Sequence, residues 1–169
     1  MRDEFIYTSI DDPRAKPLRD ALTEEYDRRY GDFYKQEGTI AEMDRYPASD
    51  FAPPLGNFVL LVREGKTIGG GGFKFYDDNT AELKRIWTSE NHRRQGLAAK
   101  ILVELETQAA RQGYQKLYLT TGFRQPEAVA LYLKNGYQNL FNLNDDFEAL
   151  RKLPFAKDIS HQNITRIAG

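Results

Sequence analysis

The residues from Asn91 to Ala98 have the types and spacing of a phosphate-binding turn. They precede a run of residues with helical periodicity. A helix start leaves backbone N–H groups without partners and carries positive potential, and Gly96 has no Cβ to keep an anion away from these amides. Arg93 and Arg94 add positive charge. The pattern predicts a pyrophosphate cradle, and the alternative is a basic loop that happens to contain a glycine.

Two other patterns, a run of glycines and a pair of histidines, could indicate a phosphate-binding loop and a metal site, but their sequence context does not support either. The segment Gly69–Gly72 is rich in glycine, but a strand follows it and the Gly-Lys-Ser/Thr of a phosphate-binding loop is missing. It predicts a bulged strand that a neighbouring backbone approaches closely. His92 and His161 are far apart and have no partners at ligand spacing, so we expect no metal site.

The periodicity of apolar residues predicts the elements that must position the turn. Gly31 and Gly113 are expected to end two of the helices. We expect strands over 5–10, 58–62, 67–76, 80–88 and 116–120, helices over 14–30, 97–113 and 126–134, a short helix near 35–44, and closing strands over 137–143 and 155–159.

Length and charge limit the classes of protein to consider. The chain has 169 residues, which suits one domain, expected over 1–159 with a polar tail over 160–169. Its 24 Lys and Arg residues against 25 Asp and Glu residues give a net charge of −1, without the basic excess typical of nucleic-acid binding. The start lacks the apolar core of a signal peptide, and no stretch reaches the ~20 apolar residues of a membrane span. We therefore expect a cytoplasmic protein with no nucleic-acid or membrane partner.

The absence of cysteine limits the chemistry. With no cysteine in the sequence, disulfides, thiolate metal sites and covalent intermediates on a thiol are excluded. Any group transfer must then proceed without a cysteine relay.

Several motifs together resemble those of the GNAT superfamily of N-acetyltransferases. Arg93-x-x-Gly96-x-Ala98 looks like its coenzyme A signature, and the segment AELKRIWT before it looks like its fourth strand. Downstream, LTTG and QPEAVALYLKNGY resemble its fifth strand, fourth helix and entry to the sixth strand. The resemblance covers about residues 5–159. It implies an α/β fold of order β-α-α-β-β-β-α-β-α-β-β with a mixed, splayed sheet.

The resemblance also implies a reaction, the direct transfer of acetyl from acetyl-CoA to an amine in a ternary complex. Pantetheine would lie on the open edge of the fourth strand, where a backbone N–H of Trp87 or Thr88 polarises the thioester carbonyl. The family often has an asparagine where this chain has Gln125-Pro126. The implied coenzyme-binding residues are Ile86, Trp87, Thr88, Arg93, Arg94, Gln95, Gly96, Leu97, Ala98, Thr121 and Gln125.

Glu82 is the candidate general base that the resemblance suggests. It stands fourteen positions before Gly96, the separation of the catalytic glutamate in histone acetyltransferases of this family. An alkyl ammonium of pKa ~10.4 must lose a proton before it attacks. The alternative is structural, because strand alternation predicts Glu82, Lys84 and Ile86 on one face, where a Glu82–Lys84 ion pair can form.

Tyr132 stands where the family has a tyrosine that protonates the departing thiolate. Because a thiol of pKa ~8.5 leaves readily, the expected benefit is modest. The alternative is a core position, since Ala128, Leu131 and Tyr132 share a helix face.

The acceptor is sought in residues 30–51, which correspond to one wall of the family's acceptor site. The segment is acidic and aromatic, with Tyr30, Phe33 and Tyr34 as candidate substrate residues. Such a surface suits a cationic small-molecule amine or amino acid, although a solvated acidic loop explains it equally well. A carboxylate-bearing acceptor would require an inward arginine, with Arg45, Arg85 and Arg124 available.

Two other functions remain open from the sequence. One is acetylation of a protein lysine or N-terminus, and the other is a coenzyme A sensor without turnover. A homodimer is also compatible with the family.

Overall fold

The computed structural model describes residues 2–34, 46–123 and 125–161, and for 30–34 only the backbone. The helix expected near 35–44 and most of the tail expected over 160–169 lie outside these residues. In chain order the elements are β1 (Asp3–Tyr7), η1 (Pro13–Ala15), α1 (Lys16–Tyr34), η4 (Ala48–Phe51), β2 (Asn57–Arg63), β3 (Lys66–Asp77), β4 (Thr80–Thr88), η5 (Glu90–His92), α2 (Leu97–Arg111), β5 (Lys116–Gly122), α3 (Pro126–Lys134), β6 (Gln138–Asn139), α4 (Phe147–Leu150) and β7 (Lys152–Asp158).

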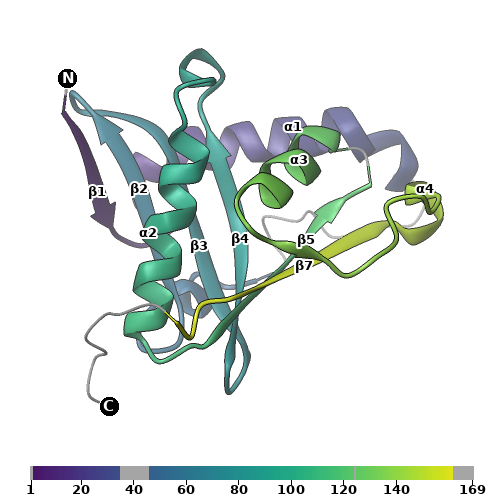
Figure 1. The fold of residues 1–169 in the computed structure, drawn as a ribbon. Coiled ribbons are helices and arrows are strands. Elements are labelled where there is room, and N and C mark those ends of the chain that lie inside the picture. The colour runs from purple at the N-terminus through teal and green to yellow at the C-terminus, as the bar shows by residue number, and fades with distance from the viewer. Residues whose placement is uncertain (1, 35–45, 124, 162–169) are drawn as a thin grey trace.

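The strands form one mixed sheet of seven strands in the order β1-β2-β3-β4-β5-β7-β6. Each pair is antiparallel except β4 and β5, which run parallel. Helices α2 and α3 cover one face of this sheet and α1 covers the other (Figure 1). The sheet therefore separates two apolar clusters, a larger one under α2 and α3 and a smaller one under α1. The predicted α/β class and splayed mixed sheet are confirmed.

Helix α1 runs past the glycine that was expected to end it. The helix continues through Gly31 to Tyr34. A glycine inside a helix costs about 1 kcal/mol relative to alanine, which weakens a helix without ending it. By contrast, Gly113 has a φ of +103° directly after the C-cap of α2, so it ends that helix as predicted.

The closing part of the chain differs from the two predicted strands. Strand β6 is only two residues long, β7 begins at Lys152, and a short helix α4 lies between them. The reason is local capping, because the Asp146 carboxylate accepts a hydrogen bond from the Glu148 N–H at 3.1 Å. The Asn142 side chain likewise accepts from the Asn144 N–H at 2.9 Å. These side-chain hydrogen bonds stabilise turns of the backbone, which replace the hydrogen bonds to a neighbouring strand.

The glycines of β3 permit close packing, as the sequence predicts. A Cβ on Gly70 would lie 2.7 Å from the Val59 carbonyl oxygen, and one on Gly71 would lie 2.6 Å from the Ile86 side chain. The pairing of β3 with β4 also changes register here, from Gly70 opposite Trp87 to Gly72 opposite Lys84.

This register change is a bulge in β4, and it overturns the predicted alternation. Arg85 takes a φ of +63° as the extra residue. Beyond it, Ile86 turns toward α2 and packs with the larger cluster, while Trp87 belongs to the cluster under α1. Ile86 therefore does not share a face with Glu82 and Lys84, because the bulge shifts the two-residue period by one.

The end of β4 that carries the bulge is not paired with the next strand, β5. Strands β4 and β5 are paired only from Thr80 opposite Lys116 to Glu82 opposite Tyr118. Past this point the ladder between them stops. The two strands therefore separate toward their C-terminal ends, which is where the predicted site lies.

Candidate functional site

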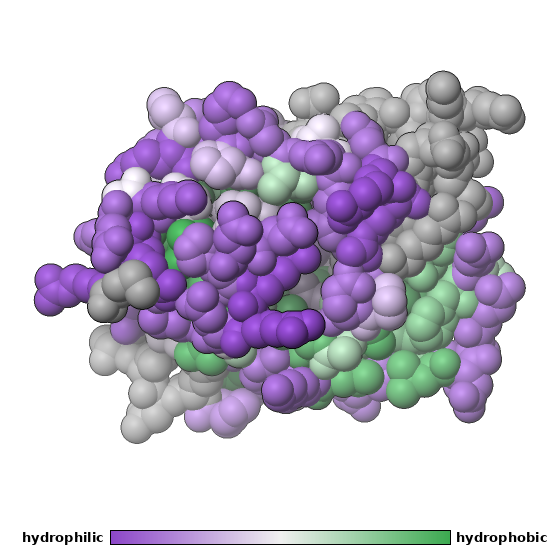
Figure 2. All heavy atoms as spheres, turned by 90° about the horizontal axis from the view of Figure 1, so that it is seen from above, coloured by the Kyte–Doolittle hydropathy of each residue, from purple (hydrophilic) through white to green (hydrophobic). Residues whose placement is uncertain are grey.

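A cleft of about 830 Å³ lies where β4 and β5 separate. Its walls come from α1, the end of β4, the start of α2, the end of β5, α3 and the start of β7. The view down onto this end of the molecule shows a largely hydrophilic rim (Figure 2). The volume lies within the ~300–1,000 Å³ typical of ligand sites.

The turn before α2 has the backbone of an anion-binding site. Gly96 is the N-cap of α2 with a φ of +73°, and its carbonyl oxygen accepts the first helical hydrogen bond, from the Lys100 N–H at 3.1 Å. The amides just after Gly96 therefore have no partners within the helix. A Cβ on Gly96 would meet no atom within 4 Å. The left-handed φ favours glycine here, and the absence of a side chain leaves open space in front of the turn.

The side chains of this turn divide between two roles. Arg93, Arg94, Leu97 and Ala98 line the cleft together with Gly96. The Gln95 side chain points elsewhere, because its Oε1 accepts a hydrogen bond from the Arg63 guanidinium at 3.0 Å. Arg63 in turn pairs with Asp3 of β1 at 2.6 Å. The side-chain oxygen of Gln95 is therefore already bound, and Gln95 is not among the residues that line the cleft.

The far wall of the cleft is built by the β5–α3 turn. Gln125 Oε1 accepts hydrogen bonds from the Gly122 N–H at 2.9 Å and from the Thr121 hydroxyl at 3.2 Å. Both Thr121 and Gln125 line the cleft. Gln125, predicted to contact the coenzyme, therefore also fixes the shape of this turn.

Tyr132 reaches the cleft from the buried side of α3. It lines the cleft although only 7% of it is exposed. Its ring packs against Tyr137, with centroids 5.6 Å apart and planes at 67°, and against Phe155 at 5.6 Å. Burial raises the pKa of the Tyr132 phenol well above its ordinary value of 10. The hydroxyl therefore keeps its proton at neutral pH.

Glu82 lies beside the cleft rather than in its lining. Its carboxylate is 3.7 Å from the Lys84 ammonium and 3.9 Å from the Lys74 ammonium, so the predicted Glu82–Lys84 ion pair is present. Both ammonium groups lie over the Tyr46 ring, at 4.8 and 4.9 Å from its centroid. Lys84 belongs to the cleft lining and Glu82 does not.

Two buried polar atoms at the cleft fit a polar ligand. Thr88 Oγ1 and His92 Nδ1 are buried without a hydrogen-bond partner among the described residues, and both residues line the cleft. Together with the open amides at Gly96, they suit the phosphate and amide groups of a coenzyme. The sequence interpretation considered His92 only as a metal ligand, although its place next to Arg93 could have indicated this role. Within the part of the chain that the structure describes, no group of three or more His, Cys, Asp or Glu side chains could hold a metal ion.

The predicted acceptor wall is described only in part. Phe51 is 2% exposed in the core, with the Arg85 guanidinium 5.1 Å from its ring centroid. Tyr46 and Phe51 therefore already contact cations of this chain. The side chains of Tyr30, Phe33 and Tyr34, and the candidates Arg45 and Arg124, lie outside the described residues.

An ion pair joins the two helices at the cleft. Arg29 of α1 pairs with Glu127 of α3, and it also pairs with Glu25 of its own helix at 3.0 Å. Arg29 and Glu127 both line the cleft. Nearby Arg29 and Arg93 lower the pKa of the Glu127 carboxyl against the opposing effect of burial. Sequence spacing gives no signal for this contact between distant residues.

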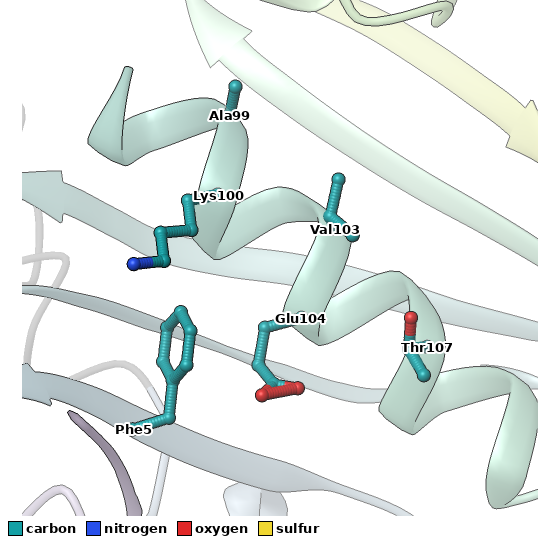
Figure 3. Close-up of a pocket in the computed structure, with 6 residues that line it drawn as sticks. All are labelled: Phe5, Ala99, Lys100, Val103, Glu104 and Thr107. Carbon is teal, nitrogen blue, oxygen red and sulfur yellow. The ribbon is translucent and has the colours of Figure 1, made fainter. Parts of the chain in front are cut away.

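A second hollow lies on the outer side of α2 (Figure 3). It has a volume of about 380 Å³ and is lined by Phe5 of β1 and by Ala99, Lys100, Val103, Glu104 and Thr107 of α2. The Lys100 ammonium lies 6.0 Å from the centroid of the Phe5 ring. The unpartnered polar atoms described above belong to the larger cleft, which is therefore the candidate site.

Comparison with known proteins identifies the family of the chain. The family model described as "Acetyltransferase (GNAT) family" matches residues 18–137. An IAA acetyltransferase of Azospirillum brasilense is 30% identical over 128 residues, which cover 73% of this chain and 81% of that protein.

Solved structures share the fold at low sequence identity. A GNAT-family acetyltransferase from Staphylococcus aureus superposes with a TM-score of 0.72 at 14% identity, covering 94% of this chain and 99% of that one. A GNAT-family acetyltransferase from Elizabethkingia anophelis with acetyl-CoA bound gives 0.65 at 16% identity, covering 92% and 97%. No described helix has both the length and the apolar character needed to cross a bilayer.

Proposed function

Because the chain belongs to the acetyltransferase (GNAT) family, we propose that it transfers acetyl directly from acetyl-CoA to a primary amine of a small molecule. The observation that carries the proposal is that the Gly96 turn, the open end of β4 and Tyr132 meet in one cleft. The acetyl-CoA bound to the E. anophelis relative supports the choice of coenzyme.

The turn at Gly96 holds the coenzyme diphosphate. The amides of Gly96, Leu97 and Ala98 donate to phosphate oxygens at the positive end of the α2 dipole. Arg93 and Arg94 line the same space and add charge. Main-chain amides carry the recognition, because the Gln95 side chain is already bound to Arg63.

Thr88 supplies the backbone donor for the thioester carbonyl. The Ser89 N–H donates to the Ile68 carbonyl of β3 at 2.8 Å. Because successive residues of a strand direct their N–H groups to opposite sides, the Thr88 N–H faces the open edge of β4 and the Trp87 N–H faces β3. Of the two predicted donors, the geometry therefore favours Thr88. A donor fixed in advance stabilises the negative charge that develops on the carbonyl oxygen.

Proton transfers accompany the exchange of bonds. The amine nitrogen forms a bond to the carbonyl carbon, the carbon–sulfur bond breaks, and the nitrogen loses one proton while the sulfur gains one. Tyr132 donates the proton to the sulfur. We assign acceptance of the amine proton to Glu82 through water, since its carboxylate lies 3.7 Å from the ammonium of Lys84, which lines the cleft.

A small acceptor suits the boundaries of the cleft. The Arg29–Glu127 pair links α1 to α3 at the cleft, which limits its width. The volume of about 830 Å³ must also take the pantetheine arm. A folded protein surface would need a wider groove.

A screen of acceptors tests this function. The purified protein is incubated with acetyl-CoA and a panel of polyamines, amino acids, aminoglycosides and peptides, and the free thiol is measured. We expect acceptor-dependent thiol release with one of the small amines. Release with peptides alone would favour a protein acetyltransferase, and coenzyme binding without release across the panel would favour a sensor.

A further inference from the structure

Glu106 is a buried carboxylate that has no role in the proposed reaction. It lies on α2, is 3% exposed, and has a member of the larger apolar cluster, Tyr137, as its hydrogen-bond partner. The Tyr137 hydroxyl donates to Glu106 Oε2 at 2.8 Å, and the Lys157 ammonium donates to Oε1 at 3.1 Å. Removing a charge from water is costly, and apolar replacements of such groups are often neutral or stabilising. Stability alone therefore does not explain why the core holds this carboxylate.

Tyr137 connects the buried carboxylate to Tyr132 through its backbone and its ring. Its N–H donates to the Tyr132 carbonyl oxygen at 2.9 Å, which is possible because Gly136 ends α3 with a φ of +88°. Its ring packs edge-on against the Tyr132 ring at 5.6 Å. Lys157 adds a third attachment, since its ammonium also donates to the Asn135 carbonyl oxygen at 3.0 Å.

The contacts of Glu106, Tyr137 and Lys157 connect helix α2 with the end of α3. Burial and the adjacent Glu106 raise the pKa of the Tyr137 phenol, so this hydroxyl remains a donor. Glu106 also lies on the helix whose first turn forms the coenzyme cradle. The contacts therefore tie the helix that holds the coenzyme to the end of the helix that carries Tyr132.

We infer that Tyr137, Glu106 and Lys157 are positioning residues that fix the Tyr132 hydroxyl relative to the coenzyme cradle. The inference rests on the proposed function, in which Tyr132 protonates the leaving sulfur. The Tyr132 ring contacts the rings of both Tyr137 and Phe155, so a displaced Tyr137 would remove one of the contacts that hold it. Small misplacements of a reacting group are costly to the rate of a reaction step.

A matched pair of hydroxyl deletions tests the inference. Tyr137→Phe keeps the ring and removes the bond to Glu106. Tyr114→Phe is the control, because Tyr114 is 4% exposed, donates its hydroxyl to the Leu55 carbonyl oxygen at 2.6 Å, packs edge-on against Phe73 at 6.1 Å, and does not line the cleft. Each variant loses the one hydroxyl hydrogen bond described for a buried tyrosine, a buried bond at Tyr137 and a part-buried one at Tyr114. Melting temperatures of both variants are measured beside the kinetics.

Only the change at Tyr137 is expected to affect turnover. We expect Tyr137→Phe to lower kcat about fivefold with an unchanged KM for acetyl-CoA, while Tyr114→Phe stays within about twofold of wild type. The same deletion is then made in a Tyr132→Phe background, where it should lower kcat no further, because a residue that acts through another adds nothing once that residue is removed. Equal kcat values for Tyr137→Phe and Tyr114→Phe would overturn the inference. So would an undiminished effect of Tyr137→Phe in the double variant.

Two variants of Glu106 separate the loss of the hydrogen bond to Tyr137 from a general loss of folding, and Tyr132→Phe tests the proposed acid separately. Glu106→Gln retains an oxygen that accepts from the Tyr137 hydroxyl, but it places an NH2 group against the Lys157 ammonium. It should therefore lower kcat less than Glu106→Leu, which should lose as much as Tyr137→Phe. If Tyr132→Phe alone leaves kcat unchanged, the proposed acid itself is wrong and the inference falls with it. If Tyr132→Phe lowers kcat and Tyr137→Phe does not, the inference about Tyr137 is rejected and the assignment of Tyr132 as the acid is kept.

Discussion

Tyr132 combines a buried ring with a place in the lining of the cleft. Its neighbours Tyr137 and Phe155 hold the ring by edge-on and tilted contacts. Burial keeps the phenol protonated by raising its pKa. A side chain that is fixed in place and protonated can donate to the sulfur, although the raised pKa makes the phenol a weaker acid than a free tyrosine. The same packing also explains why the residue looks like a core position in the sequence.

Removing the Tyr132 hydroxyl should slow turnover without weakening coenzyme binding. For Tyr132→Phe we expect kcat to fall by about 10- to 100-fold, the lower part of the range for general acids because a thiolate leaves readily. Steady-state kinetics and acetyl-CoA titration measure the two effects separately. An unchanged kcat would exclude the residue as the acid.

Glu82 is held by two lysines, so its role depends on whether it also moves a proton. In Glu82→Gln, kcat/KM should be low at neutral pH and should keep rising with pH toward the amine's own pKa of ~10.4, because only neutral amine then reacts. The wild-type profile should reach its plateau at lower pH. A pH profile of kcat/KM for both forms decides the matter, and identical profiles would leave Glu82 with a structural role.

At the scale of elements, the bulge of β4 gives the cleft its shape. Because Arg85 is the extra residue, Ile86 packs over Gly71 toward α2, and β4 leaves β5 after Glu82. Glycine at position 71 leaves room for Ile86, and a larger residue there would push against it.

Gly71→Ala tests this dependence. The new Cβ would lie 2.6 Å from Ile86 Cδ1 and 3.2 Å from Leu105 Cδ1, so we expect a loss of about 1–3 kcal/mol in the free energy of unfolding. If the Ile86 side chain cannot turn aside, the edge of β4 moves and affinity for acetyl-CoA falls as well. Denaturant unfolding and calorimetry measure both. Wild-type stability would show that the bulge accommodates the methyl group.

The edge strand β1 is held to β2 by a pH-sensitive contact. The hydrogen bond from Arg63 lowers the pKa of Asp3 from 3.8 to about 2. A carboxyl whose pKa is lower in the folded state stabilises the fold above its unfolded pKa, and this contribution is lost as pH falls through the folded pKa.

The Asp3→Asn variant should therefore be less stable than wild type at neutral pH. The difference should shrink between about pH 4 and pH 2, the interval between the unfolded and folded pKa values of Asp3. Urea unfolding of both proteins across this interval measures the difference. A difference that stays constant with pH would mean that the contact contributes through packing and not through charge.

At the scale of the whole molecule, periodic segments could be predicted from sequence and irregular ones could not. The α2 periodicity from Leu97 and the glycine at 113 give a helix whose ends match the structure closely. The bulge at Arg85 has no local signal, because it arises from packing between β3 and β4. Near Asp146, capped turns form where the apolar residues also fit a strand. The predicted closing strands therefore differ in position from the observed ones.

The candidate site follows the same division. The Gly96 turn is local in sequence and could be predicted, and the structure places its cleft-lining residues around one space. Contacts between distant residues, such as Arg29 with Glu127 and Glu106 with Tyr137, depend on the fold as a whole. The identity of the acceptor depends on such contacts, which is why the sequence alone leaves it open.

Binding of acetyl-CoA at the Gly96 turn is the central claim, and two matched variants test it. Gly96 and Gly113 both have a positive φ, and a Cβ on either would meet no atom within 4 Å. Alanine at either position therefore costs a similar backbone strain of about 1–2 kcal/mol, but only position 96 lies in the cleft lining.

Calorimetric titration of acetyl-CoA into wild type, Gly96→Ala and Gly113→Ala is the direct measurement. The predicted result is tight one-to-one binding by wild type and Gly113→Ala, with affinity reduced at least about tenfold in Gly96→Ala because the methyl group occupies the space in front of the amides. Equal affinity in all three proteins would contradict the assignment of the cleft as the coenzyme site.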